Sequence, residues 1–229
     1  YRLPNTLLLA ACAQGLAILL GILFGTIAAA FRGKKIDVTL LGAALFIYAM
    51  PAFWLGIVLL SYFGVRLGWA PLFGMTTPGR EYASTFAYIK DVAHHLVLPA
   101  VTFGLAITGS YTMIMRSALL DVFTEDYINT AKAKGFSRKY IIRRHALPNA
   151  MLPMVTIIAI NLGFIVAGAI QTETIFSWPG VGTLTFKALG ARDYPLLQGA
   201  FLITSFCVIA ANFLADIVYM YIDPRIRYQ

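Results

Sequence analysis

Charged side chains are scarce in this sequence of 229 residues, of which only 12% are Asp, Glu, Lys or Arg while 59% are apolar. Soluble domains typically contain about 25% charged and roughly 45–50% apolar residues. Because so few charges cannot cover the surface of a protein in water, we expect lipid to surround much of this chain. Cysteine is equally scarce, and two cysteines exclude a disulfide-rich scaffold.

The sequence also lacks the motifs of common enzyme classes. It contains no G-x-x-x-x-G-K-[ST] phosphate loop, no H-E-x-x-H zinc motif and no G-x-S-x-G nucleophile turn. The net charge of +8 does not come from a basic stripe interleaved with aromatic residues, so nucleic acid is not an expected partner. We therefore expect no enzyme in this chain itself, and any ATP that drives it would be hydrolysed by another subunit.

Five long stretches of the sequence contain no Asp, Glu, Lys or Arg. They cover residues 3–31, 38–65, 92–115, 146–172 and 194–215. A bilayer core about 30 Å thick is crossed by roughly 20 helical residues, so each stretch is long enough to cross once. The pattern predicts an all-α integral membrane protein, a single domain over residues 1–229 with five transmembrane helices, the last of which continues to residue 222.

The lysines and arginines are divided unequally between the connecting segments. Of the 18 in the chain, 12 lie in segments 32–37, 116–150 and 223–229. Cytoplasmic loops carry the excess of Lys and Arg, so these segments and the C-terminus are predicted to face the cytoplasm. Segments 66–96 and 173–195 then face outside, as does Tyr1, and we expect a further span before Tyr1 in the natural protein.

Two features predict the packing of the first two spans. Gly21 and Gly25 form a GxxxG spacing, which lets two helix backbones approach closely, within the chain or with a partner. Pro51 follows Met50 inside the second span, where its ring and its missing amide are expected to kink the helix.

Polar residues within or beside the predicted spans allow more than one interpretation. His94 and His95 are adjacent, so their side chains diverge on a helix, and we expect interfacial histidines bound to water more than a metal site. Asn161 and Asn212 are expected to bridge helices by hydrogen bonds, with a place in a transport pathway as the alternative. Asp216 is either solvated near the interface or functional within the pathway.

The segment 121–150 carries most of the local signals. Thr124 is a plausible helix N-cap, followed by good helix formers over 126–134 and by Gly135, which suits the left-handed residue that ends a helix. Ser137 can cap a second helix, which Pro148 is expected to end. Two short helices along the membrane surface are predicted, either as a docking face for another protein or as a basic hairpin on anionic lipid.

Several of these segments, in this order, resemble the permease subunits of ABC importers, and in particular the dipeptide/oligopeptide branch, which also takes up nickel and glutathione-like substrates. The resemblance lies in Arg2-Leu3-Pro4-Asn5-Thr6, Pro51-Ala52-Phe53-Trp54, Asp126-Tyr127 with Thr130-Ala131-Lys132-Ala133-Lys134-Gly135, His145-Ala146-Leu147-Pro148-Asn149, Ser177-Trp178-Pro179-Gly180, Arg192-Asp193-Tyr194-Pro195 and Asp223-Pro224-Arg225. It covers essentially the whole chain. The family's usual Glu-Ala-Ala is here Asn129-Thr130-Ala131, a departure in two of three positions.

The resemblance implies a type I importer permease fold with cytoplasmic coupling helices, in a bacterial or archaeal plasma (inner) membrane. It implies a second homologous permease, two ABC ATPase subunits that bind ATP and Mg²⁺, and an extracytoplasmic substrate-binding protein, with membrane lipid around the spans and no cofactor in this chain. Family members usually have six spans and a large external loop after the first, so that first span and loop are expected to be missing here.

The resemblance also assigns residues. The ATPase-coupling residues would be Asp126, Tyr127, Thr130, Ala131, Lys134 and Gly135, with Ala131 where bulk is excluded and Gly135 at the turn. The residues near an external gate or docking surface would be Glu173, Trp178, Pro179 and Gly180, although a well-packed re-entrant loop is an equal interpretation. The translocation pathway would include Asn161, Asn212 and Asp216.

Other classes of function remain open from the sequence alone. The main alternative to a peptide importer is a secondary transporter or channel driven by an ion gradient, for which Asp216 is the intramembrane carboxylate. A membrane scaffold without transport activity is another. Because the spans offer no cluster of charges for a substrate, selectivity in an importer is expected to reside in the binding protein.

Overall fold

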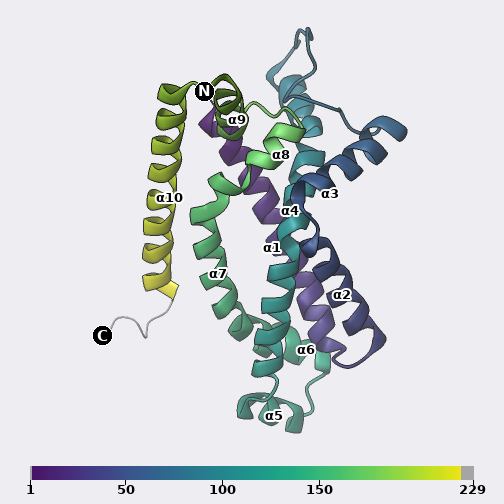
Figure 1. The fold of residues 1–229 in the computed structure, drawn as a ribbon. Helices are drawn as coiled ribbons and strands as arrows, with labels where there is room; N and C mark the ends of the chain where they lie inside the picture. The colour runs from purple at the N-terminus through teal and green to yellow at the C-terminus, as the bar shows by residue number, and fades with distance from the viewer. Residues whose placement is uncertain (1, 223–229) are drawn as a thin grey trace. The chain divides into compact units, whose positions relative to one another are not determined.

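The computed structural model describes residues 2–222, except for the side chains of residues 159–160, 162–168, 214–216 and 218–222. Within this part of the chain every regular element is a helix and no strand is formed (Figure 1). The helices are α1 (Leu3–Ala30), α2 (Lys35–Ala49), α3 (Ala52–Leu59), η1 (Leu60–Arg66), α4 (Thr85–Val122), α5 (Asp126–Ala133), α6 (Arg138–Ile141), η2 (Ile142–Ala146), α7 (Leu147–Gly168), α8 (Ile170–Ile175), α9 (Val181–Ala191) and α10 (Tyr194–Ile222). The predicted cytoplasmic segment 223–229 and the side chain of Asp216 lie outside the described residues.

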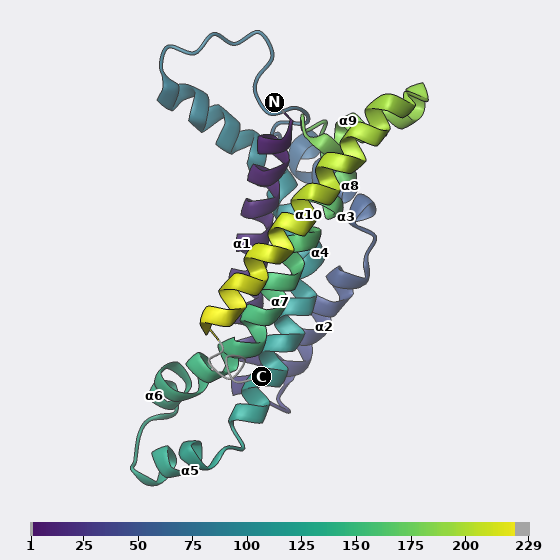
Figure 2. The ribbon, with the colours of Figure 1, turned by 90° about the vertical axis from the view of Figure 1, so that its left-hand side faces the viewer.

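Residue contacts divide the chain into two compact units. The first contains Tyr1–Leu16, Met50–Ala106 and Gly163–Ala211, and the second contains Ala17–Ala49, Ile107–Leu162 and Asn212–Gln229. The four longest helices, α1, α4, α7 and α10, each contribute residues to both units, and each can be followed in Figures 1 and 2.

In the second unit, α1 packs on α4 through glycines. A Cβ atom at Gly25 would lie 2.7 Å from the Cβ of Met115 and 2.7 Å from the carbonyl oxygen of Thr112, and a Cβ at Gly21 would overlap the Cβ of Tyr111. The GxxxG spacing therefore serves close packing within the chain, as one of its two interpretations predicted. The same helix face supplies Tyr111 and Met115, both fully buried, to the apolar core of this unit.

An ion pair joins the start of α2 to α4 in the same unit. The guanidinium of Arg116 donates to both carboxylate oxygens of Asp37, from Nε at 2.7 Å and from a terminal nitrogen at 2.8 Å. The backbone N–H of Gly33, in the turn after α1, donates to the same carboxylate at 2.9 Å. Asp37 is only 3% exposed, so this two-pronged geometry compensates a carboxylate that has lost most of its water.

The segment Met50–Ala106 of the first unit begins where the helix is interrupted at Pro51. Pro51 has an extended backbone (φ −57°, ψ 129°) and separates α2 from α3, so the predicted distortion at Met50-Pro51 is confirmed and amounts to an interruption of the helix. α3 continues into the π-helical turn η1 and packs against α8. Gly56 permits this contact, because a Cβ there would lie 3.2 Å from the side chain of Ile175.

Three helical segments are long and apolar enough to cross a membrane, namely Leu3–Ala30, Thr85–Val122 and Tyr194–Phe213. Lys35–Ala49 and Ala52–Arg66 make a fourth if the two arms of the break form one span. These correspond to four of the five predicted spans. The remaining one coincides with α7, a helix of 22 residues whose side chains are only partly described, so the number five stays a prediction.

The contact at Gly25 generates a stability prediction. Replacing Gly25→Val should lower the free energy of unfolding by about 1–3 kcal/mol, because the added atoms meet the α4 backbone, which cannot rotate away. Gly15→Ala, on the same helix, is the control, since nothing lies within 4 Å of a Cβ at Gly15. Thermal unfolding of the two variants in detergent, followed by size-exclusion chromatography, should separate them. Equal melting temperatures would contradict this account of the α1–α4 contact.

Candidate functional site

The first candidate site is the hairpin of α5 and α6 between α4 and α7. α5 begins after Glu125, whose backbone is extended (φ −70°, ψ 145°) and whose side chain makes no capping bond. Thr124 is not the N-cap, so that prediction is wrong by one residue: its hydroxyl donates to the carbonyl oxygen of Asp121 at 2.7 Å. Asp126 lies in the first turn, where the helix dipole stabilises a negative charge.

α5 has a buried face and an exposed face. Ile128 is fully buried and Ala131 is 5% exposed, and both belong to the apolar core of the second unit. Tyr127, Thr130 and Lys134 are exposed and lie on one stripe of the helix. The small side chain of Ala131, which the sequence suggested would meet a partner, packs inside this chain instead. The surface that α5 offers to a partner is therefore formed by its neighbours.

Gly135 ends α5 in the conformation that the sequence predicted. Its φ is +78°, a left-handed value that side chains with a Cβ rarely adopt, and no other group lies within 4 Å of a Cβ at this position. Its N–H donates to the carbonyl oxygen of Lys132 at 3.0 Å, which satisfies one of the free carbonyls of the helix end. Glycine is required here by backbone conformation and not by crowding.

α6 starts at a serine cap and is fastened to the end of α1. The side chain of Ser137 accepts a hydrogen bond from the N–H of Tyr140, which confirms its predicted role. The guanidinium of Arg138 donates to the carbonyl oxygen of Ala30 and lies 5.9 Å from the ring centroid of Phe31. Through these contacts α6 is held to the α1 end of the same unit.

Pro148 does not end the second helix, contrary to the prediction. The chain stays helical from α6 through the π-helical turn η2 into α7, and Pro148 is the second residue of α7. The N–H of Leu147 bonds to the carbonyl oxygen of Ile142, five residues back, which is the wider π-type spacing. A wider turn just before the proline relaxes the crowding that its ring causes in a regular α-helix.

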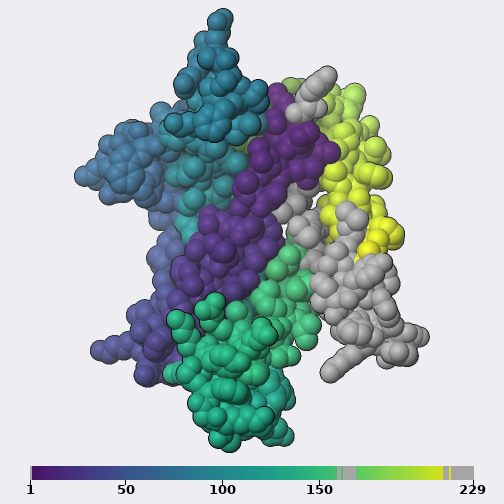
Figure 3. All heavy atoms as spheres, turned by 180° about the vertical axis from the view of Figure 1, so that it is seen from behind, coloured from purple at the N-terminus to yellow at the C-terminus, as the bar shows by residue number. Residues whose placement is uncertain are grey.

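A hollow of about 390 Å³ lies within the hairpin. Its lining residues are Phe123, Ile128, Lys132, Phe136, Arg138, Ile141 and Ile142. The hairpin is at the surface in Figure 3, where its atoms are green-teal. Five of these lining residues are apolar, and Lys132 and Arg138 are the two that carry charge.

The second candidate site surrounds Glu173 in the first unit. Glu173 is fully buried, and its two carboxylate oxygens accept hydrogen bonds from the hydroxyl of Thr6 at 2.6 Å and from the N–H of Thr183 at 3.0 Å. Thr6 in turn accepts from the N–H of Val181 at 2.8 Å. Burial raises the pKa of Glu173, and these hydrogen bonds oppose the rise. The carboxylate, which belongs to α8, thus holds the start of α1 and the first turn of α9.

The neighbours of Glu173 add further contacts between the start of α1 and the segment that joins α8 to α9. We refer to these contacts, together with those of Glu173, as the clasp. Trp178 is fully buried and its indole N–H donates to the carbonyl oxygen of Asn5 at 2.9 Å, while the amide of Asn5 donates to the carbonyl oxygen of Pro179 at 2.9 Å. Gly180 contacts the carboxylate so closely that a Cβ there would overlap it, and a Cβ at Gly182 would lie 2.6 Å from the Cα of Ile170. The Trp-Pro-Gly-Val-Gly sequence is therefore needed for packing.

The structure brings together the four residues that the resemblance assigned to an external gate or docking surface. However, the side chains of Glu173 and Trp178 are buried within the chain, as is Gly180, and Pro179 is half-buried. This geometry is that of the well-packed loop, the second of the two interpretations left open by the sequence. Among the neighbouring residues, Ser177 is exposed.

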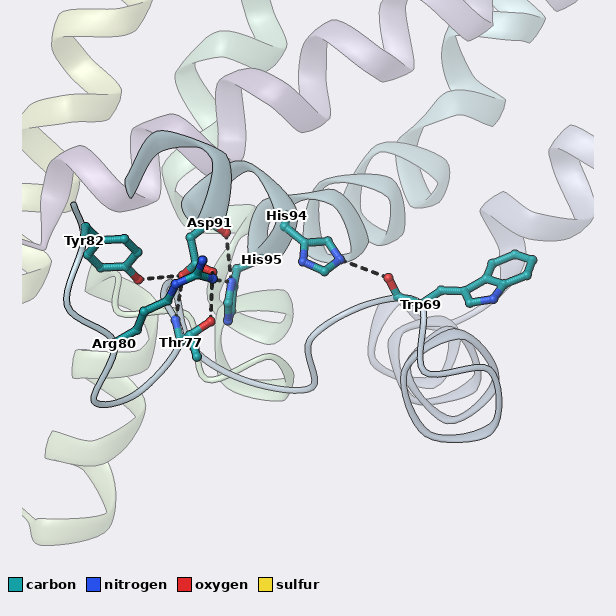
Figure 4. Close-up of polar contacts among 7 residues, drawn as sticks. All are labelled: Trp69, Thr77, Arg80, Tyr82, Asp91, His94 and His95. Carbon is teal, nitrogen blue, oxygen red and sulfur yellow. Dashed lines mark hydrogen bonds and ion pairs between the residues drawn. The ribbon is translucent and has the colours of Figure 1, made fainter. Parts of the chain in front are cut away.

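A third polar cluster was not singled out by the sequence. Asp91, 6% exposed on α4, accepts hydrogen bonds from the N–H and hydroxyl of Thr77, at 2.7 and 2.8 Å, and from the hydroxyl of Tyr82 at 2.7 Å (Figure 4). Arg80 forms an ion pair with it at 3.3 Å. These contacts fasten the loop that joins η1 to α4. The available signal was a single carboxylate at the start of a span, which in sequence looks like an ordinary solvated charge.

The adjacent histidines bind different groups, as Figure 4 shows. His94 contacts the carbonyl oxygen of Trp69 at 3.0 Å through Nε2, and His95 contacts the carbonyl oxygen of Asp91 at 2.9 Å through Nδ1. The two rings lie 6.3 Å apart at 77°. No group of three or more His, Cys, Asp or Glu side chains that could hold a metal is found among the described residues.

The three residues assigned to a pathway are not brought together by any contact in the described chain. Asn161 donates to the hydroxyl of Tyr111 at 2.8 Å, which links α7 to α4 within the second unit and confirms the predicted bridge. Asn212 is half-buried on α10 and makes no side-chain hydrogen bond in the part of the chain that the structure describes. The side chain of Asp216 is outside that part, so its role stays a prediction.

The clasp around Glu173 generates a second stability prediction. Glu173→Ala should lower the free energy of unfolding by about 2–4 kcal/mol, because two buried donors lose their acceptor. Glu173→Gln keeps one acceptor oxygen and should cost less. Gln171→Ala, at an exposed position two residues away, should melt like the native chain in detergent. If Glu173→Ala melts like Gln171→Ala, the carboxylate does not hold this turn.

Comparison with known proteins gives relatives along the whole chain. The family described as binding-protein-dependent transport system inner membrane component matches residues 21–228. The oligopeptide transport system permease protein of Bacillus subtilis is 39% identical over 227 residues, covering 99% of this chain and 70% of that protein. The dipeptide transport system permease protein of Escherichia coli K12 is 39% identical over 244 residues, covering all of this chain and 72% of that protein.

Solved structures with the same fold are more distant in sequence. An inward-facing MetNI methionine ABC transporter chain aligns with a TM-score of 0.77 at 16% identity, covering 97% of this chain and 94% of that one. An amino acid ABC transporter chain aligns with a TM-score of 0.67 at 12% identity, covering 96% and 92%. At these identities the likeness shows the fold alone, which is that of a type I ABC importer permease. With the family match over 21–228, it follows that the chain belongs to the inner membrane components of binding-protein-dependent transport systems.

Proposed function

We propose that this chain is the permease subunit of an ATP-driven importer and forms part of the pathway for short peptides or a related small solute. Membership of the binding-protein-dependent transport family over nearly the whole chain carries the proposal. The cargo class is supported by relatives that are named for dipeptide and oligopeptide transport. An ion-gradient-driven transporter, the alternative from the sequence, is not what this family membership supports.

The proposal includes partners that supply what this chain lacks. Two ABC ATPase subunits would bind ATP and Mg²⁺ on the cytoplasmic side, a second homologous permease would complete the pathway, and a substrate-binding protein would deliver cargo from outside. The excess of Lys and Arg supports a cytoplasmic position for segments 32–37, 116–150 and the C-terminus. The absence of a phosphate-loop motif from the sequence agrees with ATP hydrolysis elsewhere.

We assign the contact with an ATPase subunit to the exposed stripe of α5, formed by Tyr127, Thr130 and Lys134. Two features of the hairpin support this assignment. The buried face of α5 places Ile128 and Ala131 in one apolar core with Leu119 of α4. α6 continues through η2 into α7 without a break. A displacement of the exposed stripe would therefore be passed to α4 and α7 together, as a coupling helix requires.

ATP binding would then change the spans through this contact. Closure of the two ATPases draws the hairpins of the two permeases together, and the spans reorient so that the pathway opens outward. Cargo enters from the docked binding protein, and hydrolysis restores the inward-open state. Such a shift of populations needs a contact that differs in free energy between the two states, which is the role proposed for α5.

The left-handed turn at Gly135 provides a test of coupling. Gly135→Val should uncouple ATP hydrolysis from uptake, because a β-branched residue is strained by about 1–2 kcal/mol or more at φ +78° and the end of α5 would shift. Gly79→Val is the matched control, since Gly79 also has a positive φ of 70° and nothing within 4 Å, but lies in the loop between η1 and α4. Uptake and ATP hydrolysis are measured in proteoliposomes of the whole transporter. Unchanged coupling in Gly135→Val would contradict the proposed role of the turn.

The partners themselves are tested by extraction in mild detergent from the native cells. A tagged chain should bring down two ATPase subunits and a second permease, identified by mass spectrometry. Thr130→Arg, which adds bulk and charge to the exposed stripe without touching the buried face, should lose the ATPases and keep the permease. Gln171→Ala is the control variant, and it should recover the ATPases and the second permease as the native chain does. Recovery of the native chain alone, under conditions that preserve a known importer, would overturn the proposed function.

A further inference from the structure

The segment formed by α6 and η2 exposes three cations that have no partner among the residues the structure describes. Lys139, Arg143 and Arg144 are exposed, and none of them makes an ion pair or side-chain hydrogen bond with any residue the structure describes. Arg138 differs, because its guanidinium is already bound to the carbonyl oxygen of Ala30 and lies over Phe31. We refer to Lys139, Arg143 and Arg144 as the basic cluster.

The basic cluster lines a shallow hollow with two hydroxyl groups. The hollow has a volume of about 440 Å³, and its lining residues are Ser137, Lys139, Tyr140, Arg143 and Arg144. Lys139 and Arg143 are four residues apart and so lie on one face of the helix, as do Tyr140 and Arg144. Residues that carry guanidinium, ammonium and hydroxyl donors and line one hollow suit a phosphate group, which accepts several charge-assisted hydrogen bonds at once.

The position of the basic cluster in the sequence gives its distance from the start of the predicted span. α6, η2 and α7 are continuous, and the charge-free run of the predicted span begins at residue 146. At about 1.5 Å per residue, the cluster lies about 3–10 Å before the start of that run. The headgroup layer on each side of the hydrocarbon core is roughly 5–8 Å thick. With α6, η2 and α7 running along the bilayer normal, the three cations would lie near the depth of the lipid phosphates.

We propose that the basic cluster binds the phosphodiester headgroup of an anionic membrane lipid, with Ser137 and Tyr140 as further donors. The lipid is favoured over an acidic protein surface because of this depth, and because the stripe assigned to the ATPase contact lies on α5. The inference rests on the membrane placement of α7 that the proposed function includes, but it does not depend on coupling to the ATPases.

The test uses the transporter extracted as a complex and exchanged into a zwitterionic detergent. Dioleoyl-phosphatidylglycerol and dioleoyl-phosphatidylcholine are titrated in turn, and retained lipid is counted by native mass spectrometry. The native chain should retain phosphatidylglycerol in preference to phosphatidylcholine. Each charge removed near an anionic lipid lowers affinity about fivefold, so Lys139→Gln/Arg143→Gln/Arg144→Gln should lose affinity for phosphatidylglycerol about a hundredfold.

A control variant removes the same charge elsewhere. Arg66→Gln/Lys90→Gln/Lys187→Gln changes three exposed cations in the predicted external segments and should leave phosphatidylglycerol retention within about twofold of native. Equal losses in both variants would show that net charge alone is responsible and would overturn the proposal. Equal retention of the two lipids by the native chain, a comparison that needs no variant, would overturn it as well.

The remaining outcomes separate the lipid from other occupants. A large excess of inorganic phosphate should not displace phosphatidylglycerol, and if it does so fully the cluster binds a free anion and the lipid proposal is wrong. If the cluster variant keeps its lipid and loses the ATPase subunits, the surface is a protein contact and the proposal is also wrong. Loss of lipid with the ATPases retained supports the lipid site, whatever the outcome for Gly135→Val.

Discussion

Buried carboxylates need hydrogen-bond donors at fixed positions, and this requirement organises the turns of a chain whose helices are mostly apolar. Apolar contact is non-directional, so it favours the packing of two helices without fixing how they are joined or oriented. A carboxylate that has lost its water is costly unless donors from the protein replace it. In the described chain Asp37 is held by Arg116, Asp91 by Thr77 and Tyr82, and Glu173 by Thr6 and Thr183. Each contact lies at a connection between helices, which is where apolar packing specifies least.

The features that the sequence predicted correctly have causes within a few residues. Pro51 interrupts a helix because of its own ring, and Gly135 adopts a positive φ because it lacks a Cβ. Ser137 caps α6 through the N–H of a residue three positions later. Gly25 was identifiable as a packing position from its spacing, although the partner helix was not. Composition and charge spacing likewise sufficed for the all-helical membrane fold, and the family followed from the resemblance of several short segments.

The features that sequence reasoning missed depend on distant residues. Glu173 and Thr6 are 167 positions apart, so the sequence left a well-packed loop and an external gate as equal interpretations and did not reveal the partner of the carboxylate. The face of α5 that turns inward is set by contact with α4, and this contact buries Ala131. Pro148 was read as a helix end because a proline is hard to place in a regular helix, but the π-helical turn before it changes the local spacing. These are tertiary effects, and a single sequence carries little trace of them.

The hairpin of α5 and α6 separates two kinds of surface that one short segment could easily have mixed. Tyr127 and Thr130 are exposed on α5, whereas the basic cluster, unpaired among the described residues, follows on α6 and η2, beyond the turn at Gly135. Arg138 stands between the two surfaces and is bound to the end of α1, so it belongs to neither. A hairpin that passes motion to the spans needs one surface that is moved by the ATPase and another that is held in place. If an ATPase subunit moves α5 while the basic cluster on α6 and η2 is held at the headgroup layer, the hairpin would tilt α4 and α7 instead of sliding as a whole along the membrane.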